Sequence, residues 1–554
     1  MTDRLIIALA QLNPTMGDIA GNAEKARAAR AVAAADGADL VLFSELFITG
    51  YPPEDLILKP AFQQEAEDAV RALAAETADG GPALLIGTPW RQDGRLYNAV
   101  ALLEGGEVAA TRLKYDLPNY SVFDEKRVFA PGPLPGPVNF RGVRLGVPIC
   151  EDVWSDDVPE CLSETGAEIL LIPNGSPFEA GKGEVRTNIM VSRVQETGLP
   201  LAYVNQVGGQ DELVFDGASF VLNADCSLAV HLPSFEERIA ITRWARGEDD
   251  VWRCETGERP APAEGLEATY RAMVLGLRDY VNKNRFPGVV LGMSGGIDSA
   301  LSAAVAVDAL GSERVWCVML PSRYTSGESF SDASECAGLL GVRHDEVSIK
   351  PAVDAFDTML AGLFQGREPD ITEENIQSRS RGLALMAISN KFGHMVLTTG
   401  NKSEMSVGYA TIYGDMAGGY SVLKDIYKTT VFALSHWRNQ VRPDDVLGPE
   451  GRVIPENIIV KPPTAELREG QKDEDSLPPY EVLDDILESL VEKELSFEEI
   501  LERGHDAATV RRIEHLLYIA EYKRRQAPPG VKVTLKNFGR DRRYPITNGF
   551  RDAI

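Results

Sequence analysis

A glycine- and serine-rich segment at residues 292–299, Gly-Met-Ser-Gly-Gly-Ile-Asp-Ser, is the most informative candidate for chemistry in the chain. It lies between an apolar run at residues 288–291 and an alanine-rich run at residues 300–307, an order that predicts strand, tight loop and helix. Such a loop directs free backbone N–H groups towards an anion at the N-terminus of the helix. A Walker loop would carry lysine near its end, whereas this loop carries Asp298, a carboxylate suited to Mg²⁺. The segment therefore predicts a nucleotide site.

Cys150 is the second candidate for chemistry, because it ends an apolar run at residues 143–149. A thiol at a strand-to-helix elbow can be exposed, and the N-terminus of the helix would favour its thiolate. The adjoining Glu151 and Asp152 oppose that effect, so the thiol requires a base and a cation nearby. The first half of the chain has no histidine before His231, which argues against a Cys–His pair.

A glutamate and a lysine supply the groups that this cysteine requires. Glu45 closes the apolar run at residues 40–44, and Lys114 lies in the segment Leu-Lys-Tyr-Asp-Leu-Pro-Asn-Tyr at residues 113–120. A carboxylate can take the thiol proton and later activate water. An ammonium group beside it can stabilise the oxyanion of a tetrahedral intermediate. Together with Cys150, these residues suggest hydrolysis started by a thiol.

Alternating strand-like and helix-like segments must position both sets of residues. In a first domain, residues 1–245, strand signals occur at residues 5–12, 40–43, 83–86, 143–149, 168–172 and 200–205. An irregular, charged segment at residues 246–265 is interpreted as a linker. In a second domain, residues 266–554, strand signals at residues 288–291, 314–320 and 395–399 alternate with helices. This alternation predicts a parallel, doubly wound sheet.

Charge and composition restrict the class of function. The formal net charge of −27 opposes an extended nucleic-acid surface, so no nucleic-acid partner is expected. No apolar run approaches the roughly 18 residues that a membrane helix needs, so no membrane partner is expected. The six cysteines are scattered without the spacing of a zinc site, and no signal peptide is recognised. Both features indicate a reducing, cytoplasmic location.

The two sets of motifs resemble two known families. Residues 292–299 resemble the pyrophosphate loop of the ATP pyrophosphatases, which cleave ATP to AMP and pyrophosphate while adenylating an acceptor. Glu45, Lys114 and Cys150, in the contexts Phe-Ser-Glu-Leu-Phe and Ile-Cys-Glu-Asp-Val-Trp, resemble the nitrilase or carbon–nitrogen hydrolase superfamily, which cleaves C–N bonds through a thioester. The resemblance implies an α/β protein with an N-terminal four-layer αββα nitrilase-like sandwich. It also implies a C-terminal doubly wound parallel sheet of the ATP pyrophosphatase (adenine nucleotide alpha hydrolase-like) type.

The order of these motifs resembles, over essentially the whole chain, the glutamine-dependent NAD⁺ synthetases. Supporting runs lie at residues 373–381, 398–404, 413–415 and 461–467. The resemblance implies that glutamine is hydrolysed to ammonia at the first site and that this ammonia amidates ATP-activated deamido-NAD⁺ at the second. The products would be NAD⁺, AMP, pyrophosphate and glutamate. Glutamine, ATP and deamido-NAD⁺ are then the expected substrates, and Mg²⁺ is the expected metal.

The same resemblance implies roles for particular side chains. The expected glutamine contacts are Tyr120, Ser176 and Lys182. The expected ATP contacts are Gly292, Met293, Ser294, Gly295, Gly296, Ile297, Asp298, Ser299, Thr399, Lys428 and Thr464. The expected deamido-NAD⁺ contacts are Asn375, Glu404 and Lys523, and the expected Mg²⁺ ligands are Asp298 and Glu404. Glu404 thus has two expected roles, which the sequence does not separate.

Two other functions remain open at this point. A transfer-RNA-modifying ATP pyrophosphatase would share the loop, but it normally needs a basic binding face, which the net charge of −27 opposes. A metabolite-sensing scaffold with silent sites would have no reason to keep the Glu45, Lys114 and Cys150 set together with a complete loop. Because ammonia in water at neutral pH is mostly protonated, we expect an enclosed route between the two sites. We also expect a homo-oligomer.

Overall fold

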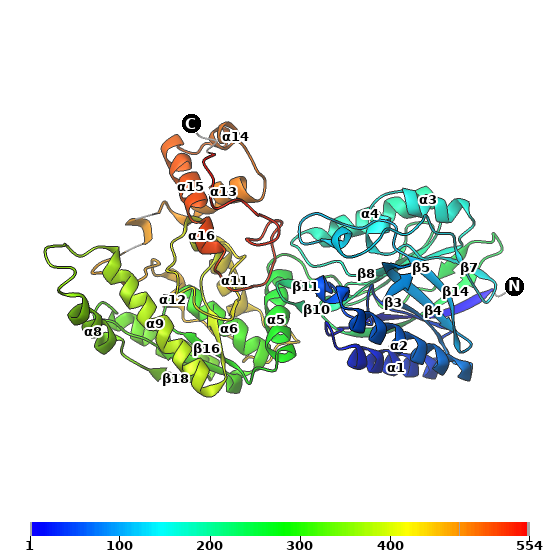
Figure 1. Cartoon of the computed structure of the whole chain (residues 1–554), viewed down its shortest axis with the longest axis horizontal. Helices are drawn as coiled ribbons and strands as arrows, with labels where there is room; N and C mark the ends of the chain where they lie inside the picture. The colour runs from blue at the N-terminus through cyan, green and yellow to red at the C-terminus, as the bar shows by residue number, and fades with distance from the viewer. Residues whose placement is uncertain (1–2, 472, 476, 551–554) are drawn as a thin grey trace. The chain divides into compact units, whose positions relative to one another are not determined.

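Strands and helices alternate along the chain in two units, residues 1–265 and 266–554 (Figure 1). The computed structural model describes residues 3–471, 473–475 and 477–550. The linker predicted at residues 246–265 is shorter than expected, because strand β15 (Trp252–Cys254) pairs antiparallel with β14 (Arg238–Arg246). Burial of the apolar Trp252 side chain holds this segment in the first unit.

Two sheets pack face to face in the first unit. Parallel pairing of β1 with β2 and of β2 with β3 forms the centre of the larger sheet, and antiparallel strands flank it. Leu5, Ile7 and Leu9 alternate along β1 and share a buried core with Phe140 and Leu171 of the other sheet. The larger sheet has the order β15, β14, β1 (Arg4–Gln11), β2 (Leu40–Leu42), β3 (Ala83–Gln92), β4 (Arg95–Glu104) and β5 (Glu107–Leu113). The smaller has the order β13 (Leu228–His231), β12 (Phe220–Leu222), β9 (Leu201–Asn205), β8 (Ile169–Asn174), β7 (Val143–Gly146) and β6 (Val138–Phe140), and β10 (Val207–Gln210) pairs separately with β11 (Leu213–Asp216).

Helices cover the outer face of each sheet, as Figure 1 shows for this unit. Helices α1 (Ile19–Ala35) and α2 (Pro60–Glu76) share a buried core with Ala8 and Val41 of the larger sheet. Helices α3 (Asp157–Glu164) and α4 (Lys182–Thr197) share another with Leu170 and Ile172 of the smaller sheet. The layers follow the order helix, sheet, sheet, helix. This order confirms the predicted αββα sandwich.

The second unit contains a five-stranded sheet in which every pair is parallel. Its order is β18 (Arg343–Glu346), β17 (Val315–Met319), β16 (Val289–Gly292), β19 (Met395–Thr398) and β20 (Tyr420–Ser421). The chain runs outwards from β16 to β17 and β18, then returns to the other side of β16 for β19 and β20. The predicted doubly wound sheet is therefore confirmed. In such a sheet a crevice opens at the carboxyl ends of the strands where the order reverses, here β16 and β19.

Helices complete the second unit. Apolar residues of α8 and α9 pack on one face of the sheet, and α6 contacts β16 and β17. A separate core joins α10 to α13, α14 and α15. The helices are α5 (Gly265–Lys283), α6 (Ile297–Leu310), α7 (Gly327–Leu340), α8 (Lys350–Leu360), α9 (Ile371–Phe392), α10 (Lys402–Val407), α11 (Lys428–Gln440), α12 (Glu456–Val460), α13 (Tyr480–Val491), α14 (Phe497–Glu502), α15 (Ala507–Ile519) and α16 (Glu521–Arg524). Over the part of the chain that the structure describes, no helix combines the length and apolar character needed to cross a bilayer.

Candidate active sites

Lys114 is completely buried in the first unit between two carboxylates. Its Nζ lies 2.6 Å from Glu45 Oε1 and 2.8 Å from Glu125 Oε1. Burial alone would lower the pKa of Lys114, but the neighbouring charges of Glu125, Glu45 and Cys150 raise that pKa well above its ordinary value. The ammonium group is therefore a fixed positive charge at neutral pH.

Glu45 is held by groups from three other segments. Asn98 Nδ2 donates to Glu45 Oε1 at 2.7 Å, and the backbone N–H of Gly175 donates to Glu45 Oε2 at 3.1 Å. Gly87 on β3 lies against the backbone that carries Glu45, because a Cβ at residue 87 would come within 2.3 Å of the Leu46 nitrogen. Only glycine permits this close approach. The carboxylate is thus fixed by packing as well as by hydrogen bonds.

Cys150 begins a single 3₁₀ turn, Cys150–Val153, with a backbone φ of 46°. Asp152 fixes this turn by accepting backbone N–H groups from Ile149 at 3.0 Å and from Asp116 at 2.7 Å. The expectation that the thiol is exposed and that a helix favours its thiolate is wrong, because Cys150 is buried and the turn is too short to supply a strong dipole.

The surroundings of Cys150 favour its neutral thiol. Burial and the charge of Glu45 raise the pKa of Cys150 well above its ordinary value, while Lys114 and a hydrogen bond from the Gly175 N–H act in the opposite direction. The thiol is therefore protonated at neutral pH and needs a base before it can attack. Glu45 is a candidate for this base, since its carboxylate contacts Lys114 and the Gly175 N–H, two groups that also act on the thiol.

Glu125 is a site residue that the sequence interpretation missed. Its carboxylate accepts from Tyr51 Oη at 2.8 Å and from Asn98 Nδ2 at 3.2 Å, in addition to Lys114. Burial raises the pKa of Glu125, and the charge of Lys114 opposes this rise. In the sequence it lies in the polar run Asp-Glu-Lys-Arg, which resembles a solvated loop. No local pattern distinguishes it from a surface glutamate.

The three predicted glutamine contacts lie in the first unit, two of them around Glu151. The Tyr120 hydroxyl donates to both oxygens of the Glu151 carboxylate at 3.0 Å, and the charge of Lys182 contributes to lowering the pKa of Glu151. Burial outweighs this and raises that pKa overall. Ser176 follows β8 and is buried, with Arg186 Nε donating to its Oγ at 3.1 Å. All three thus present polar groups at or near the cysteine turn.

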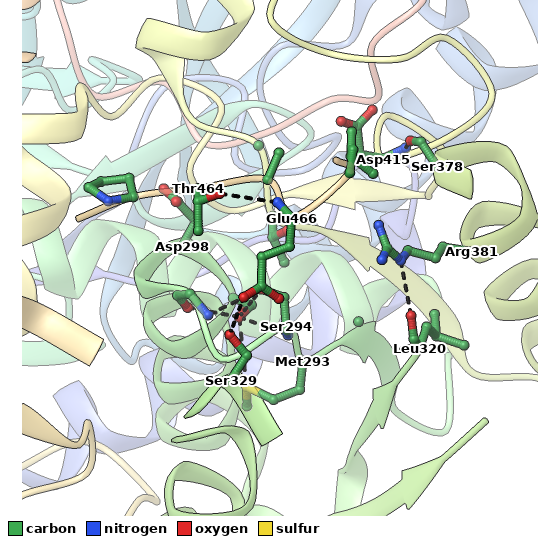
Figure 2. Close-up of a pocket in the computed structure, with 18 of the residues that line it drawn as sticks. Met293, Ser294, Asp298, Leu320, Ser329, Ser378, Arg381, Asp415, Thr464 and Glu466 are labelled. Carbon is green, nitrogen blue, oxygen red and sulfur yellow. Dashed lines mark hydrogen bonds between the residues drawn. The ribbon is translucent and has the colours of Figure 1, made fainter. Parts of the chain in front are cut away.

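A cavity of about 270 Å³ opens in the second unit at the carboxyl ends of β16, β17 and β19 (Figure 2). Seven of the eight predicted loop residues line it, and Gly295 does not. Gly295 has a φ of 78°, and a Cβ there would lie 2.4 Å from the Ser329 carbonyl oxygen, so glycine is needed for the path of the loop. Thr399, Lys428, Glu404 and Thr464 also line the cavity. The structure therefore brings most of the predicted nucleotide residues together.

Asp298 lies beside Lys428, the one lysine among the predicted ATP contacts. Lys428 Nζ forms an ion pair with Asp298 Oδ2, and Asn401 Nδ2 donates to Asp298 Oδ1 at 2.8 Å. Lys428 also lies 3.6 Å from Glu404 Oε1. Burial and the charge of Asp298 raise the pKa of Glu404 to about 8, although Lys428 acts in the opposite direction. Glu404 is therefore largely protonated at neutral pH in this arrangement.

The two carboxylates fit Mg²⁺ only with help from a nucleotide. Within residues 3–471, 473–475 and 477–550, no group of three or more His, Cys, Asp or Glu side chains is arranged to hold a metal ion. Mg²⁺ is commonly bound by one or two carboxylates together with substrate phosphates and water. Asp298 and Glu404 satisfy this mode, provided that phosphate oxygens complete the shell, Lys428 releases Asp298 and Glu404 loses its proton.

Two predicted deamido-NAD⁺ contacts lie outside the lining of this cavity. Asn375 Oδ1 accepts from Thr411 Oγ1 at 3.0 Å. Lys523 Nζ donates to the carbonyl oxygens of Gly408 at 2.8 Å and Ala410 at 2.7 Å. A smaller cavity shares Glu404 with the first and is lined by Ala410, so Lys523 supports its wall.

Several lining residues of the main cavity escaped prediction. The carboxylate of Glu466 lies inside it, where Ser329 Oγ donates to Oε1 at 2.9 Å (Figure 2). Arg381 Nε donates to the Leu320 carbonyl oxygen at 3.0 Å, and Asp473 also lines the cavity. Glu466 and Arg381 belong to runs that supported the family resemblance, and that membership was the one available signal.

A buried Cys–Glu–Lys set in an αββα sandwich, joined to a glycine-loop nucleotide site in a doubly wound sheet, defines an amidohydrolase fused to an ATP-using unit. Residues 6–253 match the Carbon-nitrogen hydrolase family model, and residues 269–527 match the NAD synthase family model.

The similarity extends over the whole chain. The glutamine-dependent NAD(+) synthetase of Rhodobacter capsulatus is 56% identical over 552 residues, covering 100% of both chains. That of Thermotoga maritima is 44% identical over 586 residues, again covering 100% of both. The solved structure of the Acinetobacter baumannii glutamine-dependent NAD⁺ synthetase, in complex with ADP, is 41% identical with a TM-score of 0.79, covering 99% of each chain. The chain belongs to the glutamine-dependent NAD(+) synthetases, which are ligases that use ATP as a substrate.

Proposed function

We propose that glutamine hydrolysis in this enzyme is carried out by Cys150, Glu45 and Lys114. Glu45 takes the thiol proton as sulfur attacks the carboxamide carbon, and Lys114 stabilises the resulting oxyanion. Glu45 then gives its proton to the departing nitrogen, which leaves as ammonia, and a thioester remains. A water molecule then gives a proton to Glu45 and its hydroxyl group to the thioester carbon. The C–S bond breaks, the sulfur takes the proton from Glu45, and glutamate is released with the thiol and the Glu45 carboxylate restored.

The observation that carries this proposal is the completely buried Lys114 ammonium, paired with Glu45 at 2.6 Å. A buried charge is costly unless it is paired, and Glu45 and Glu125 together pair it on two sides. The cation is therefore fixed before glutamine arrives, as stabilisation of an oxyanion requires. Tyr120, Ser176 and Lys182 are proposed to bind the amino-acid end of glutamine, since a hydroxyl and an ammonium group suit a carboxylate.

The second reaction is proposed to occur in the cavity of the second unit. The carboxylate of deamido-NAD⁺ attacks the α-phosphorus of ATP, pyrophosphate leaves, and ammonia then displaces AMP to form the amide. Residues 292–299, Thr399, Lys428 and Thr464 are proposed to hold ATP through backbone N–H groups, hydroxyls and one ammonium. Mg²⁺, held by Asp298 and Glu404, would neutralise charge on the pyrophosphate.

The acceptor is proposed to lie beside Glu404, where the larger and smaller cavities meet. Asn375 and Lys523 are proposed to contact it from the outer part of this region. To contact the acceptor directly, Lys523 has to release the carbonyl oxygens of Gly408 and Ala410. If it keeps these hydrogen bonds, it acts on the acceptor by holding residues 408 and 410 in place. Burial lowers the pKa of Lys523, although its charge suits the acceptor's phosphates and carboxylate.

A homo-oligomer and a cytoplasmic location complete the proposal. Four large apolar side chains on or beside α8 and α9 are strongly exposed: Met359 70%, Leu363 80%, Ile371 67% and Leu383 66%. A partner chain could cover apolar side chains that are this exposed, and sedimentation equilibrium would test the state of assembly. The cytoplasmic location is proposed because few, scattered cysteines are typical of proteins in a reducing compartment.

The division of labour is tested with Cys150→Ala. Glutamine-driven NAD⁺ formation should be lost because no thioester can form, while ammonium-driven formation should persist because ammonia can attack the adenylate directly. NAD⁺ and AMP are measured with each nitrogen source, and circular dichroism reports whether the variant is folded. A folded variant that also fails with saturating ammonium would refute the proposal.

A further inference from the structure

Arg186, on α4, uses its whole guanidinium group beside Ser176. Nε donates to Ser176 Oγ at 3.1 Å, and Nη2 donates to the carbonyl oxygens of Ser176 at 3.0 Å and Pro177 at 2.9 Å. Nη1 donates to both carboxylate oxygens of Asp216, at 2.8 and 2.9 Å. Arg186 and Ser176 are each only 3% exposed, so this arrangement is closed to solvent.

The backbone of Ser176 is satisfied by a different residue. Its N–H donates to Asn205 Oδ1 at 2.9 Å, and Asn205 Nδ2 donates to its carbonyl oxygen at 3.0 Å. The Asn205 side-chain amide, at the end of β9, therefore pairs with the backbone of Ser176 as a neighbouring strand would. Ser176 is fixed in position before any ligand binds, and the direction of its hydroxyl proton depends on Arg186 and on the buried Tyr203 hydroxyl, which also interacts with Ser176.

The contact with Arg186 restricts that direction. A serine hydroxyl has one proton to donate and can accept two hydrogen bonds, whereas the guanidinium group can only donate. Because Arg186 Nε donates to Ser176 Oγ, the hydroxyl proton of Ser176 must point away from Arg186. Lys182 lies one helical turn before Arg186 on α4, so both side chains project from the same face of the helix.

We propose that Arg186 is a positioning residue, which directs the hydroxyl proton of Ser176 towards the carboxylate of bound glutamine. This inference rests on the proposed function, in which Ser176 and Lys182 bind the amino-acid end of glutamine. Arg186 does not touch the substrate. It acts by excluding the orientation in which the hydroxyl proton points towards Arg186, so that the proton is directed to the side on which an anionic carboxylate can accept it.

A double-mutant cycle tests the inference. Ser176→Ala, Arg186→Lys and the double variant are compared by the KM for glutamine and by kcat, with ammonium-driven NAD⁺ synthesis measured in parallel. Arg186→Lys keeps a positive charge for Asp216 but loses the fork that reaches Ser176. Ser176→Ala should raise the KM for glutamine about 10- to 100-fold, as expected for loss of a hydrogen bond to a charged group. Arg186→Lys should raise that KM by a smaller factor, because the Ser176 hydroxyl is still present and can rotate to donate. The double variant should exceed Ser176→Ala by no more than about twofold.

The outcomes separate this inference from the assignment on which it rests. If Ser176→Ala leaves the KM for glutamine unchanged, the assignment of Ser176 as a glutamine contact is wrong, and the inference falls with it. If both single changes raise the KM and their factors multiply in the double variant, Arg186 acts independently of Ser176 and only the inference is wrong. An unchanged KM in Arg186→Lys also overturns it.

A second variant keeps the test decisive if Arg186→Lys does not fold. Arg186→Gln combined with Asp216→Asn leaves no stranded buried charge, so the first unit should stay folded by circular dichroism. The amide oxygen of the side chain introduced by Arg186→Gln can also accept hydrogen bonds, so this side chain does not force the orientation of the Ser176 hydroxyl. The KM for glutamine should rise by the same factor as in Arg186→Lys. A KM equal to that of the parent enzyme would refute the role of Arg186.

Discussion

Lys114→Met should destabilise the first unit as well as stop glutamine hydrolysis. The parent side chain is completely buried, with its Nζ 2.6 Å from Glu45 and 2.8 Å from Glu125. Removal of one partner from a buried ion pair costs about 3–5 kcal/mol of unfolding free energy, because the other charge is left uncompensated. For a unit of this size, each kcal/mol lowers the melting temperature by about 2–4 °C, which gives a shift of about 6–20 °C.

Differential scanning calorimetry can measure this shift for the first unit alone. Added ATP should raise the melting temperature of the second unit, since a ligand stabilises the fold that binds it, and so identify the other transition. The loss should be larger at pH 8 than at pH 5, because Glu125, whose pKa burial already raises, can take up a proton at the lower pH. Its stabilising protonation is lost as the pH rises through that raised pKa.

Glu125→Gln provides the matched control for the electrostatic explanation. Introduced into Lys114→Met, it removes one stranded carboxylate and should recover part of the lost melting temperature, while glutaminase activity stays absent. If Lys114→Met alone lowers the free energy of unfolding by less than about 1 kcal/mol, the buried cluster does not have the energetic role assigned to it. If Glu125→Gln lowers the stability of Lys114→Met further, charge is not the cause of the loss.

Three further predictions concern the second unit and its nitrogen supply. Asp298→Asn should suppress AMP formation by about 100-fold or more while glutaminase activity survives, and unchanged ATP turnover in a coupled AMP assay would contradict the metal role. Glu404→Gln should raise the melting temperature more at pH 9 than at pH 6. The parent carboxyl has a pKa raised to about 8, so the stability that its protonated form gives is lost as the pH rises through 8. An equal shift in melting temperature at both pH values would exclude this explanation. With ¹⁵N-glutamine and excess unlabelled ammonium, mass spectrometry should find label in NAD⁺ above the bulk ratio, whereas dilution to that ratio would mean free release.

Features coded by short local patterns could be predicted from the sequence. The strand, glycine loop and helix around residues 292–299 follow from residue types and their order, and the structure places seven of these eight residues in one cavity. The association of Glu45 and Lys114 was predicted by chemistry and resemblance, and the structure joins them in an ion pair. Alternation of strands and helices was enough to predict parallel sheet in the second unit.

Features created by packing between distant segments could not be predicted. Glu125 is buried because Tyr51, 74 residues away, and Lys114 fold onto it, and its own neighbours are polar. The burial of Cys150 likewise depends on the whole sandwich rather than on its strand. The charged residues before strand β15 predict a linker, whereas the buried Trp252 decides the position of this strand.

Gly87 has a consequence for the genetics of the enzyme. Every single-base change that replaces a glycine with another residue introduces a Cβ, and at this position a Cβ collides with the backbone beside Glu45. Gly87 belongs to the first unit, so ATP-dependent amidation in the second is not touched directly. A missense allele at this codon would therefore impair glutamine-driven NAD⁺ synthesis and leave ammonium-driven synthesis in place. We expect added ammonium salts to relieve the resulting growth defect.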